Sequence, residues 1–211
     1  MSLEEIREQN KQLVVEKALE LYLKKGIEKT TISEIAAAAG LTERSVYRYF
    51  ESRTDVVIAA SYRFWDRVTQ EVKSYIEKRS ISRLSGLERI RILLNYYSRM
   101  YFMNPDGVRF ILDAEMTLYK AGVTDSVKNR PPVRFDKSSS PLAMAIRDGL
   151  ADGSVNPTVD AKELYYSAYD SILGTMERLA LGTPSAGDIN NHKRMQDLCE
   201  LYMRAFEGGP R

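Results

Sequence analysis

The stretch Thr30–Arg53 reads TTISEIAAAAGLTERSVYRYFESR and decides the fold of the first part of this 211-residue chain. Thr31 is followed three residues later by Glu34, and this spacing is a capping box that starts a helix. Apolar residues then recur at helical spacing as far as Gly40, where glycine can adopt the left-handed conformation that ends a helix. Thr42 can cap a second helix. The stretch therefore predicts two short helices joined by a tight turn.

The second of these helices is predicted to present a polar and basic surface. Val46 and Phe50 are expected to face inward with Leu41. The outward side chains are then Glu43, Arg44, Ser45, Tyr47, Arg48 and Tyr49. A helix presented in this way fits the major groove of DNA, with its early residues over base edges and its hydroxyl and basic groups beside phosphates. The pattern predicts a DNA-binding helix-turn-helix.

The same residues resemble the DNA-binding domain of the TetR family of transcriptional regulators. The resemblance rests on the threonine cap, the Ile-Ala pair, the Ala-Gly turn and the run Ser45-Val46-Tyr47-Arg48-Tyr49-Phe50, and it covers about the first quarter of the chain. It implies that Glu43 and Arg44 lie over base edges. It implies phosphate contacts for Thr31, Ser45, Tyr47, Tyr49 and Arg53, the last at a position where the family usually has lysine.

Charge permits DNA binding but does not predict it. The formal net charge is +2, and residues 1–53 contain nine Lys or Arg against nine Glu. The basic residues gather at the end of the first predicted helix (Lys24, Lys25, Lys29) and on the second short helix and its exit (Arg44, Arg48, Arg53). A local patch can be basic on a neutral domain, although many solvated helix faces look the same. A helical hairpin with a merely solvated polar face is the alternative.

The rest of the chain is predicted to be helical, which makes the protein all-α with about nine helices. We expect a helix-turn-helix domain over residues 1–53 and a helical ligand-binding and dimerisation domain over residues 54–211. Inward stripes are predicted on the first helix (Ile6, Leu13, Val14, Ala18, Leu21) and, after a Ser52–Asp55 capping box, on the fourth (Ile58, Tyr62, Trp65, Val68, Val72, Ile76). Later helices are expected near 85–103, 105–121, 139–151, 160–181 and 187–207. Residues 122–141 are predicted to form a surface loop or a lid.

Aromatic and methionine side chains are frequent in the middle helices. Most such residues belong to an ordinary core, but several buried tyrosines can also line a cavity for an amphipathic molecule. In the TetR family an inducer lies between the fourth helix and those that follow. The candidate lining residues are Tyr62, Trp65, Tyr96, Met100, Phe110, Met116 and Tyr169.

The last two helices are predicted to be a partner surface. Their stripes contain small residues that allow close helix approach, although both stripes could simply close the core of the chain. Similar proteins pair these helices across a two-fold axis, and a dimer with two DNA-binding helices recognises more base pairs than one helix can. The candidate interface residues are Ser171, Ile172, Met176, Leu198 and Tyr202.

Composition argues against enzyme, metal-site and membrane functions. His192 and Cys199 are the only histidine and the only cysteine, so one chain cannot build a histidine cluster, a cysteine-rich metal site or a disulfide. A thiol sensor or a metal site shared across a dimer stays an alternative for this pair. We expect no cofactor, no membrane partner and a cytoplasmic location, since neither a spanning segment nor a signal peptide is recognisable.

The predicted function is a homodimeric transcriptional repressor that binds a near-palindromic operator in double-stranded DNA and is released by a small amphipathic or hydrophobic inducer. One alternative is a constitutive chromosome-organising or division-linked DNA-binding dimer whose body binds a protein. A helical interaction module without a DNA role is the third interpretation.

Overall fold

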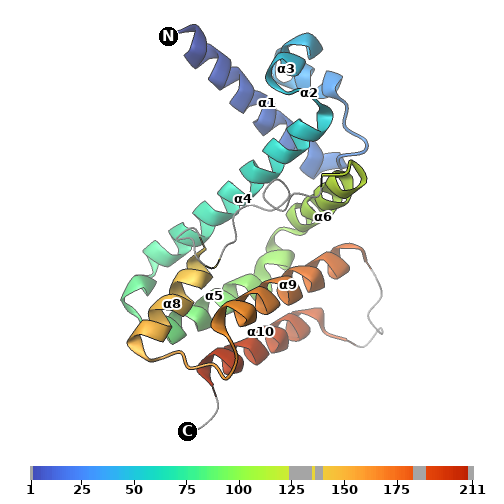
Figure 1. Cartoon of the computed structure of the whole chain (residues 1–211). Helices are drawn as coiled ribbons and strands as arrows, with labels where there is room; N and C mark the ends of the chain where they lie inside the picture. The colour runs from blue at the N-terminus through green and yellow to red at the C-terminus, as the bar shows by residue number, and fades with distance from the viewer. Residues whose placement is uncertain (1, 124–134, 136–139, 183–188, 209–211) are drawn as a thin grey trace. The chain divides into compact units, whose positions relative to one another are not determined.

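The computed structural model describes residues 2–123, 135, 140–182 and 189–208 (Figure 1). Within these ranges the chain forms nine α-helices, one short 3-10 helix and no strand, which confirms the predicted all-α fold. The α-helices are α1 (Leu3–Lys25), α2 (Ile32–Ala38), α3 (Glu43–Tyr49), α4 (Arg53–Lys78), α5 (Gly86–Met103), α6 (Pro105–Lys120), α8 (Pro141–Asp152), α9 (Ala161–Ala180) and α10 (Asn191–Glu207). The 3-10 helix is η1 (Ile81–Arg83). Most of segment 122–141, predicted as a loop or lid, lies outside the described residues.

Capping boxes explain where several helices begin. In each box a hydroxyl side chain accepts the backbone N–H three residues on, and the acidic side chain at that position accepts a bond in return. The pairs are Ser2–Glu5, Thr31–Glu34, Ser52–Asp55 and Ser85–Glu88. None of the described helices is both long enough and apolar enough to cross a membrane.

The chain divides into two compact units, and the first contains residues Met1–Val68 and Arg109–Pro131. Its core is built by α1, α2, α3, the first part of α4 and the second part of α6. Buried members of this core include Val14, Ala18, Leu19, Ile35, Val46, Val57, Phe64, Phe110 and Leu118. Because α6 supplies four buried side chains here, this unit is larger than the helix-turn-helix alone.

The predicted inward faces of α1 and α4 were wrong in part. Ile6 and Leu13 are each 38% exposed, and the buried part of α1 begins only at Val14. On α4 the buried residues of this unit are Val56, Val57, Ala60, Ser61 and Phe64. The predicted stripe through Ile58 and Trp65 packs only partly against the edge of the core. Apolar spacing marks a helical face, but the partner helices decide which side of that face is fully covered.

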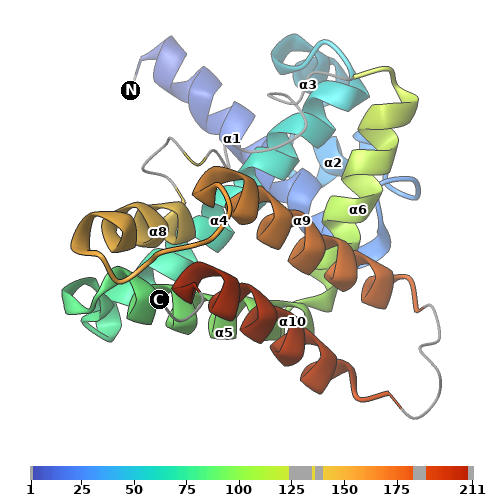
Figure 2. The same cartoon turned by 60° about the horizontal axis from the view of Figure 1, so that its bottom comes forward.

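The second unit contains residues Thr69–Val108 and Pro132–Arg211. Helix α5 packs against α8 and α10, and α9 and α10 run side by side (Figure 2). The contact between α5 and α8 is unusually close. A Cβ atom added at Gly86 would lie 2.2 Å from Cα of Gly149, and one added at Gly149 would lie 2.3 Å from Cγ2 of Val155. Glycine is therefore required where these two helices meet.

Candidate DNA-binding site

The first short helix of the motif, α2, is fixed at its start by Thr31 and Glu34. The Thr31 hydroxyl accepts the Glu34 N–H at 3.3 Å, and the Glu34 carboxylate accepts the Thr31 N–H at 2.9 Å. Lys25 at the end of α1 pairs with the same carboxylate at 2.5 Å. This ammonium group, with the bonds from Thr31, lowers the pKa of Glu34 to about 2. The two charges therefore tie α1 to the start of α2.

The turn after α2 has the predicted geometry. Gly40 has φ +67°, the left-handed conformation that glycine adopts without steric cost. The Leu41 N–H then bonds back to the carbonyl of Ala36 at 2.9 Å, and Thr42 accepts the Ser45 N–H at 3.2 Å to begin α3. The sequence-based prediction of a helix-turn-helix at this position is confirmed by these bonds.

Helix α3 buries one side and leaves the other open. Val46 and Phe50 lie in the core of the unit as predicted. Among the predicted contact residues, Glu43, Arg44, Tyr47 and Arg48 are exposed, and Ser45 and Tyr49 are half-buried. Tyr47 is 50% exposed, so a large aromatic side chain with a hydroxyl group projects from a seven-residue helix. The arrangement offers an acid, two guanidinium groups and three hydroxyl groups on one short element.

Tyr49 has a role inside the protein that the sequence did not suggest. Its hydroxyl accepts hydrogen bonds from Asn10 at 3.3 Å and from Arg48 at 3.1 Å. The bond from Arg48, supported by Asn10, lowers the pKa of Tyr49. The residue thus joins α1 to α3, and its proposed phosphate contact remains a prediction. Asn10 was missed because its partner is 39 residues away.

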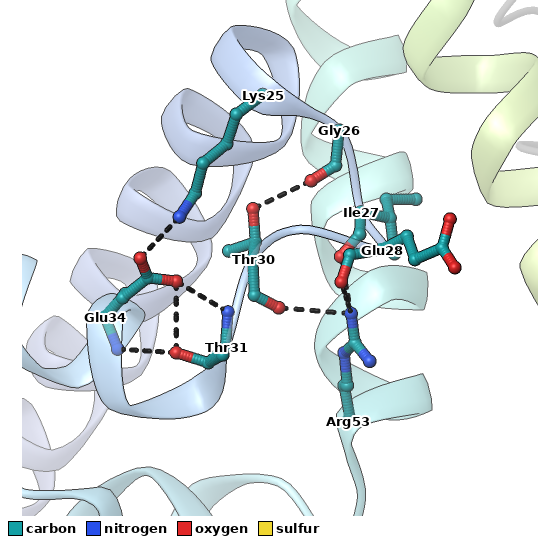
Figure 3. A network of polar contacts seen from close by, with 8 residues as sticks. All are labelled: Lys25, Gly26, Ile27, Glu28, Thr30, Thr31, Glu34 and Arg53. Carbon is teal, nitrogen blue, oxygen red and sulfur yellow. Dashed lines mark hydrogen bonds and ion pairs between the residues drawn. The ribbon is translucent and has the colours of Figure 1, made fainter.

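Arg53 is also engaged within the unit. Its Nη2 donates to the carbonyl oxygens of Ile27 and Thr30, the latter at 3.1 Å (Figure 3). The Thr30 hydroxyl donates in turn to the carbonyl of Gly26 at 2.8 Å. The first residue of α4 therefore holds the turn between α1 and α2. Its side chain stays exposed, and its phosphate contact is a prediction that these bonds neither require nor prevent.

The candidate ligand-lining residues fall in both units. Tyr62, Trp65, Phe110 and Met116 belong to the first unit, and Tyr96, Met100 and Tyr169 belong to the second. Phe110 is buried between Tyr22 and Phe64, with ring centroids 6.0 and 5.6 Å away, so it fills the core of the first unit. Met116 is 47% exposed, which does not fit the lining of an enclosed cavity.

The candidate interface residues divide between core and surface. Ile172 and Met176 are buried within the chain itself, so they were assigned to the wrong face of α9. The Tyr202 hydroxyl lies 2.7 Å from the Ser171 hydroxyl and donates to the Ser167 carbonyl at 3.0 Å, which links α10 to α9.

A surface groove lies beside this link and includes an apolar residue that the sequence analysis missed. The groove has a volume of about 540 Å³ and is lined by Thr175, Ile189, Asn190, Lys193, Arg194, Asp197, Leu198 and Leu201. Leu201 is 65% exposed.

Comparison with known proteins assigns this arrangement to a family. Residues 14–60 match the family model described as bacterial regulatory proteins, tetR family. Residues 14–60 therefore form a DNA-binding domain of the TetR family. The match covers α1 from the start of its buried part, the helix-turn-helix and the beginning of α4. TetR-family regulators are DNA-binding transcription factors and not enzymes, so the match of residues 14–60 agrees with the expected non-enzymatic function.

Solved structures share the fold of this chain at low identity. The fatty acid degradation regulator FadR from Bacillus halodurans is 14% identical, with 92% of this chain and 94% of that chain covered and a TM-score of 0.62. RolR in complex with resorcinol is 15% identical, with coverage of 94% and 88% and a TM-score of 0.63. FadR from Bacillus subtilis in complex with stearoyl-CoA is 13% identical, with coverage of 92% and 98% and a TM-score of 0.56.

Proposed function

We propose that the protein is a homodimeric repressor that binds a near-palindromic operator and is released by a small amphipathic or hydrophobic ligand. The observation that carries the proposal is the open side of α3, where Glu43, Arg44, Tyr47 and Arg48 are exposed on a helix held rigidly by its caps. Arginine can bond a guanine edge through two donors, and glutamate can accept from a cytosine amino group. The domain division after residue 53 and a cytoplasmic location are part of the same proposal.

Dimerisation is supported by the outer sides of α9 and α10. The exposed Leu201 and the half-buried Leu198 line the groove together with Ile189, and charged residues lie beside them. Two copies paired there would present two reading helices. Half-sites about one helical turn, roughly 10 bp, or slightly more apart would then be expected in the operator.

Ligand release is supported by the liganded relatives. RolR was solved with resorcinol and Bacillus subtilis FadR with stearoyl-CoA, two ligands of very different size with apolar parts. The remaining candidate lining residues, Tyr62, Trp65, Tyr96, Met100 and Tyr169, are all half-buried. A ligand that prefers one of two conformations shifts the population toward it, and it weakens operator binding when that conformation fits DNA poorly.

The DNA-binding part of the proposal is tested by selecting duplexes from a random library with the purified protein. Affinity for the best duplex is then measured by fluorescence anisotropy over a range of salt concentrations. We expect tight, sequence-dependent binding that weakens steeply with salt, because phosphate contacts release counterions. Binding that does not depend on salt or sequence would remove the proposal and favour the interaction module.

The ligand part is tested with stearoyl-CoA and resorcinol as probes. Trp65 is the only tryptophan, and its ring centroid lies 5.7 Å from that of Phe64 in an edge-to-face arrangement, so its fluorescence reports changes in the packing of α4. Each probe is titrated with and without the selected duplex. A ligand that releases DNA must bind more weakly in the presence of DNA by the same factor. Equal binding in both titrations for these and related phenolic and acyl compounds would favour the constitutive DNA-binding dimer.

A further inference from the structure

The second half of α6 is built into the unit that carries the DNA-binding helices. Phe110, Ile111, Ala114 and Leu118 are all buried in the same core as the helix-turn-helix. These positions recur at helical spacing, so one face of α6 is fixed against α1 and α4. Asp113 lies next to that face, immediately before Ala114, and is half-buried.

Asp113 bonds directly to the turn that connects α1 with α2. Its Oδ2 accepts the backbone N–H of Ile27 at 2.8 Å, across 86 residues of sequence. A Cβ atom at Gly26 would lie 3.6 Å from the same oxygen, at ordinary van der Waals distance, so the carboxylate packs against this residue as well. Gly26 has φ +85°, which allows the chain to leave α1 in the direction of this carboxylate. A carboxylate that accepts a backbone N–H makes a stronger bond than a neutral acceptor does.

The same turn is held from its other side by Arg53. Ile27 donates its N–H to α6 and accepts a bond from α4 through its carbonyl oxygen, and Thr30 adds a second carbonyl for the arginine (Figure 3). These bonds use one nitrogen of the guanidinium group. Arginine has five N–H donors, so a guanidinium fixed in this way retains donors for a phosphate. One short turn thus connects α6 with a candidate DNA-contact residue.

We propose that Asp113 is a positioning residue for DNA binding, which holds the Gly26–Thr30 turn so that Arg53 is oriented toward a phosphate. The inference rests on the proposed function, because it assigns Arg53 to the operator contact. It also gives α6 a means of controlling the DNA affinity of the helix-turn-helix. When Asp113 moves away from the Ile27 N–H, the turn is released, and the Arg53 guanidinium group is released with it. Contiguous hydrogen bonds of this kind are a physical means of coupling between elements.

The test is a double-mutant cycle on the selected duplex. Asp113→Ala removes the acceptor, Arg53→Ala removes the phosphate contact, and the two are combined. We expect Asp113→Ala to weaken binding about tenfold in the presence of Arg53 and less than about twofold in its absence. Asp113→Ala should also make the slope of log affinity against log salt less steep, by about one for each DNA-binding domain, because one phosphate contact is lost. Tyr119→Ala, an exposed change six residues along α6, should alter neither quantity.

The results distinguish a failure of the proposed DNA-binding function from a failure of the role assigned to Asp113. A wild-type protein without salt-dependent duplex binding would overturn the proposed function and this inference together. Normal wild-type binding, with equal losses from Asp113→Ala in both Arg53 backgrounds or with no loss at all, would overturn the inference alone. If thermal unfolding shows that Asp113→Ala does not fold, Asp113→Asn decides. Its amide oxygen can still accept the bond but carries no charge, so a loss of about threefold that depends on Arg53 is expected, and an unchanged affinity contradicts the inference.

Discussion

At the scale of single residues, Arg44 is the exposed side chain of α3 best suited to read a base. We predict that Arg44→Ala weakens binding to the selected duplex by about 1–3 kcal/mol and broadens base preference, because a bidentate contact with guanine is lost. Anisotropy titrations against the selected duplex and its single-base variants measure both effects. Tyr47→Phe is the comparison, and it should weaken binding to all sequences about equally since it removes a phosphate contact. Unchanged affinity and selectivity in Arg44→Ala would show that another residue reads the base.

Tyr22 predicts a response of the protein to alkaline pH. Burial raises the pKa of this tyrosine to about 12, and the neighbouring Arg53 guanidinium limits the rise. The unfolded chain releases the proton from about pH 10 upward while the folded chain keeps it, so the stability associated with the neutral phenol is lost as pH rises toward 12. Between pH 9 and 11, Tyr22→Phe should lose about 1 kcal/mol less unfolding free energy than the wild type. Urea unfolding at both pH values checks this, and equal losses would contradict it.

At the scale of elements, the Gly86–Gly149 contact between α5 and α8 makes a sharp stability prediction. Gly86→Ala should destabilise the protein by about 1–3 kcal/mol, because the new methyl group would require the two helix backbones to separate. Gly174→Ala in α9 is the matched control, since no atom lies within 4 Å of its added Cβ atom. That change should be neutral or stabilise by up to about 1 kcal/mol through helix propensity. Urea unfolding at one protein concentration measures both, and similar effects of the two variants would contradict the packing argument.

Helix starts and the helix-turn-helix could be predicted from the sequence because the interactions that fix them are local. The Thr31–Glu34 box, the left-handed Gly40 and the Thr42 cap all involve residues at most three positions apart. The contacts that hold the reader in place are not local. Asn10 with Tyr49, Arg53 with Ile27 and Asp113 with Ile27 join residues 39, 26 and 86 positions apart, and no spacing rule indicates them.

The buried faces of long helices were harder to predict for a related reason. Periodicity on α4 favoured Ile58 and Trp65, whereas the core covers Val57, Ala60 and Phe64. On α9 it favoured a partner surface at Ile172 and Met176, which instead close the core of the second unit. An apolar stripe reports that something covers a helix, but it does not distinguish the chain's own core from a second copy.

At the scale of the whole molecule, assembly should depend on the outer side of α10. Leu201→Glu should convert the dimer to monomers with little change in unfolding free energy, because this side chain is exposed within one chain. Ile172→Glu should unfold the protein instead, since it places a charge in the core. Sedimentation measures the first effect and circular dichroism the second. A wild-type protein that is monomeric at micromolar concentration yet binds its operator fully would remove the dimer from the proposed function.

The hydrogen bonds between Arg53 and the Gly26–Thr30 turn also affect the thermodynamics of DNA binding. A free arginine side chain carries about 2 kcal/mol of rotamer entropy, which must be lost when it settles on a phosphate. Here the Ile27 and Thr30 carbonyls restrict the guanidinium group while the protein is still free. That part of the ordering is completed during folding, so DNA association has less conformational entropy left to lose at this contact.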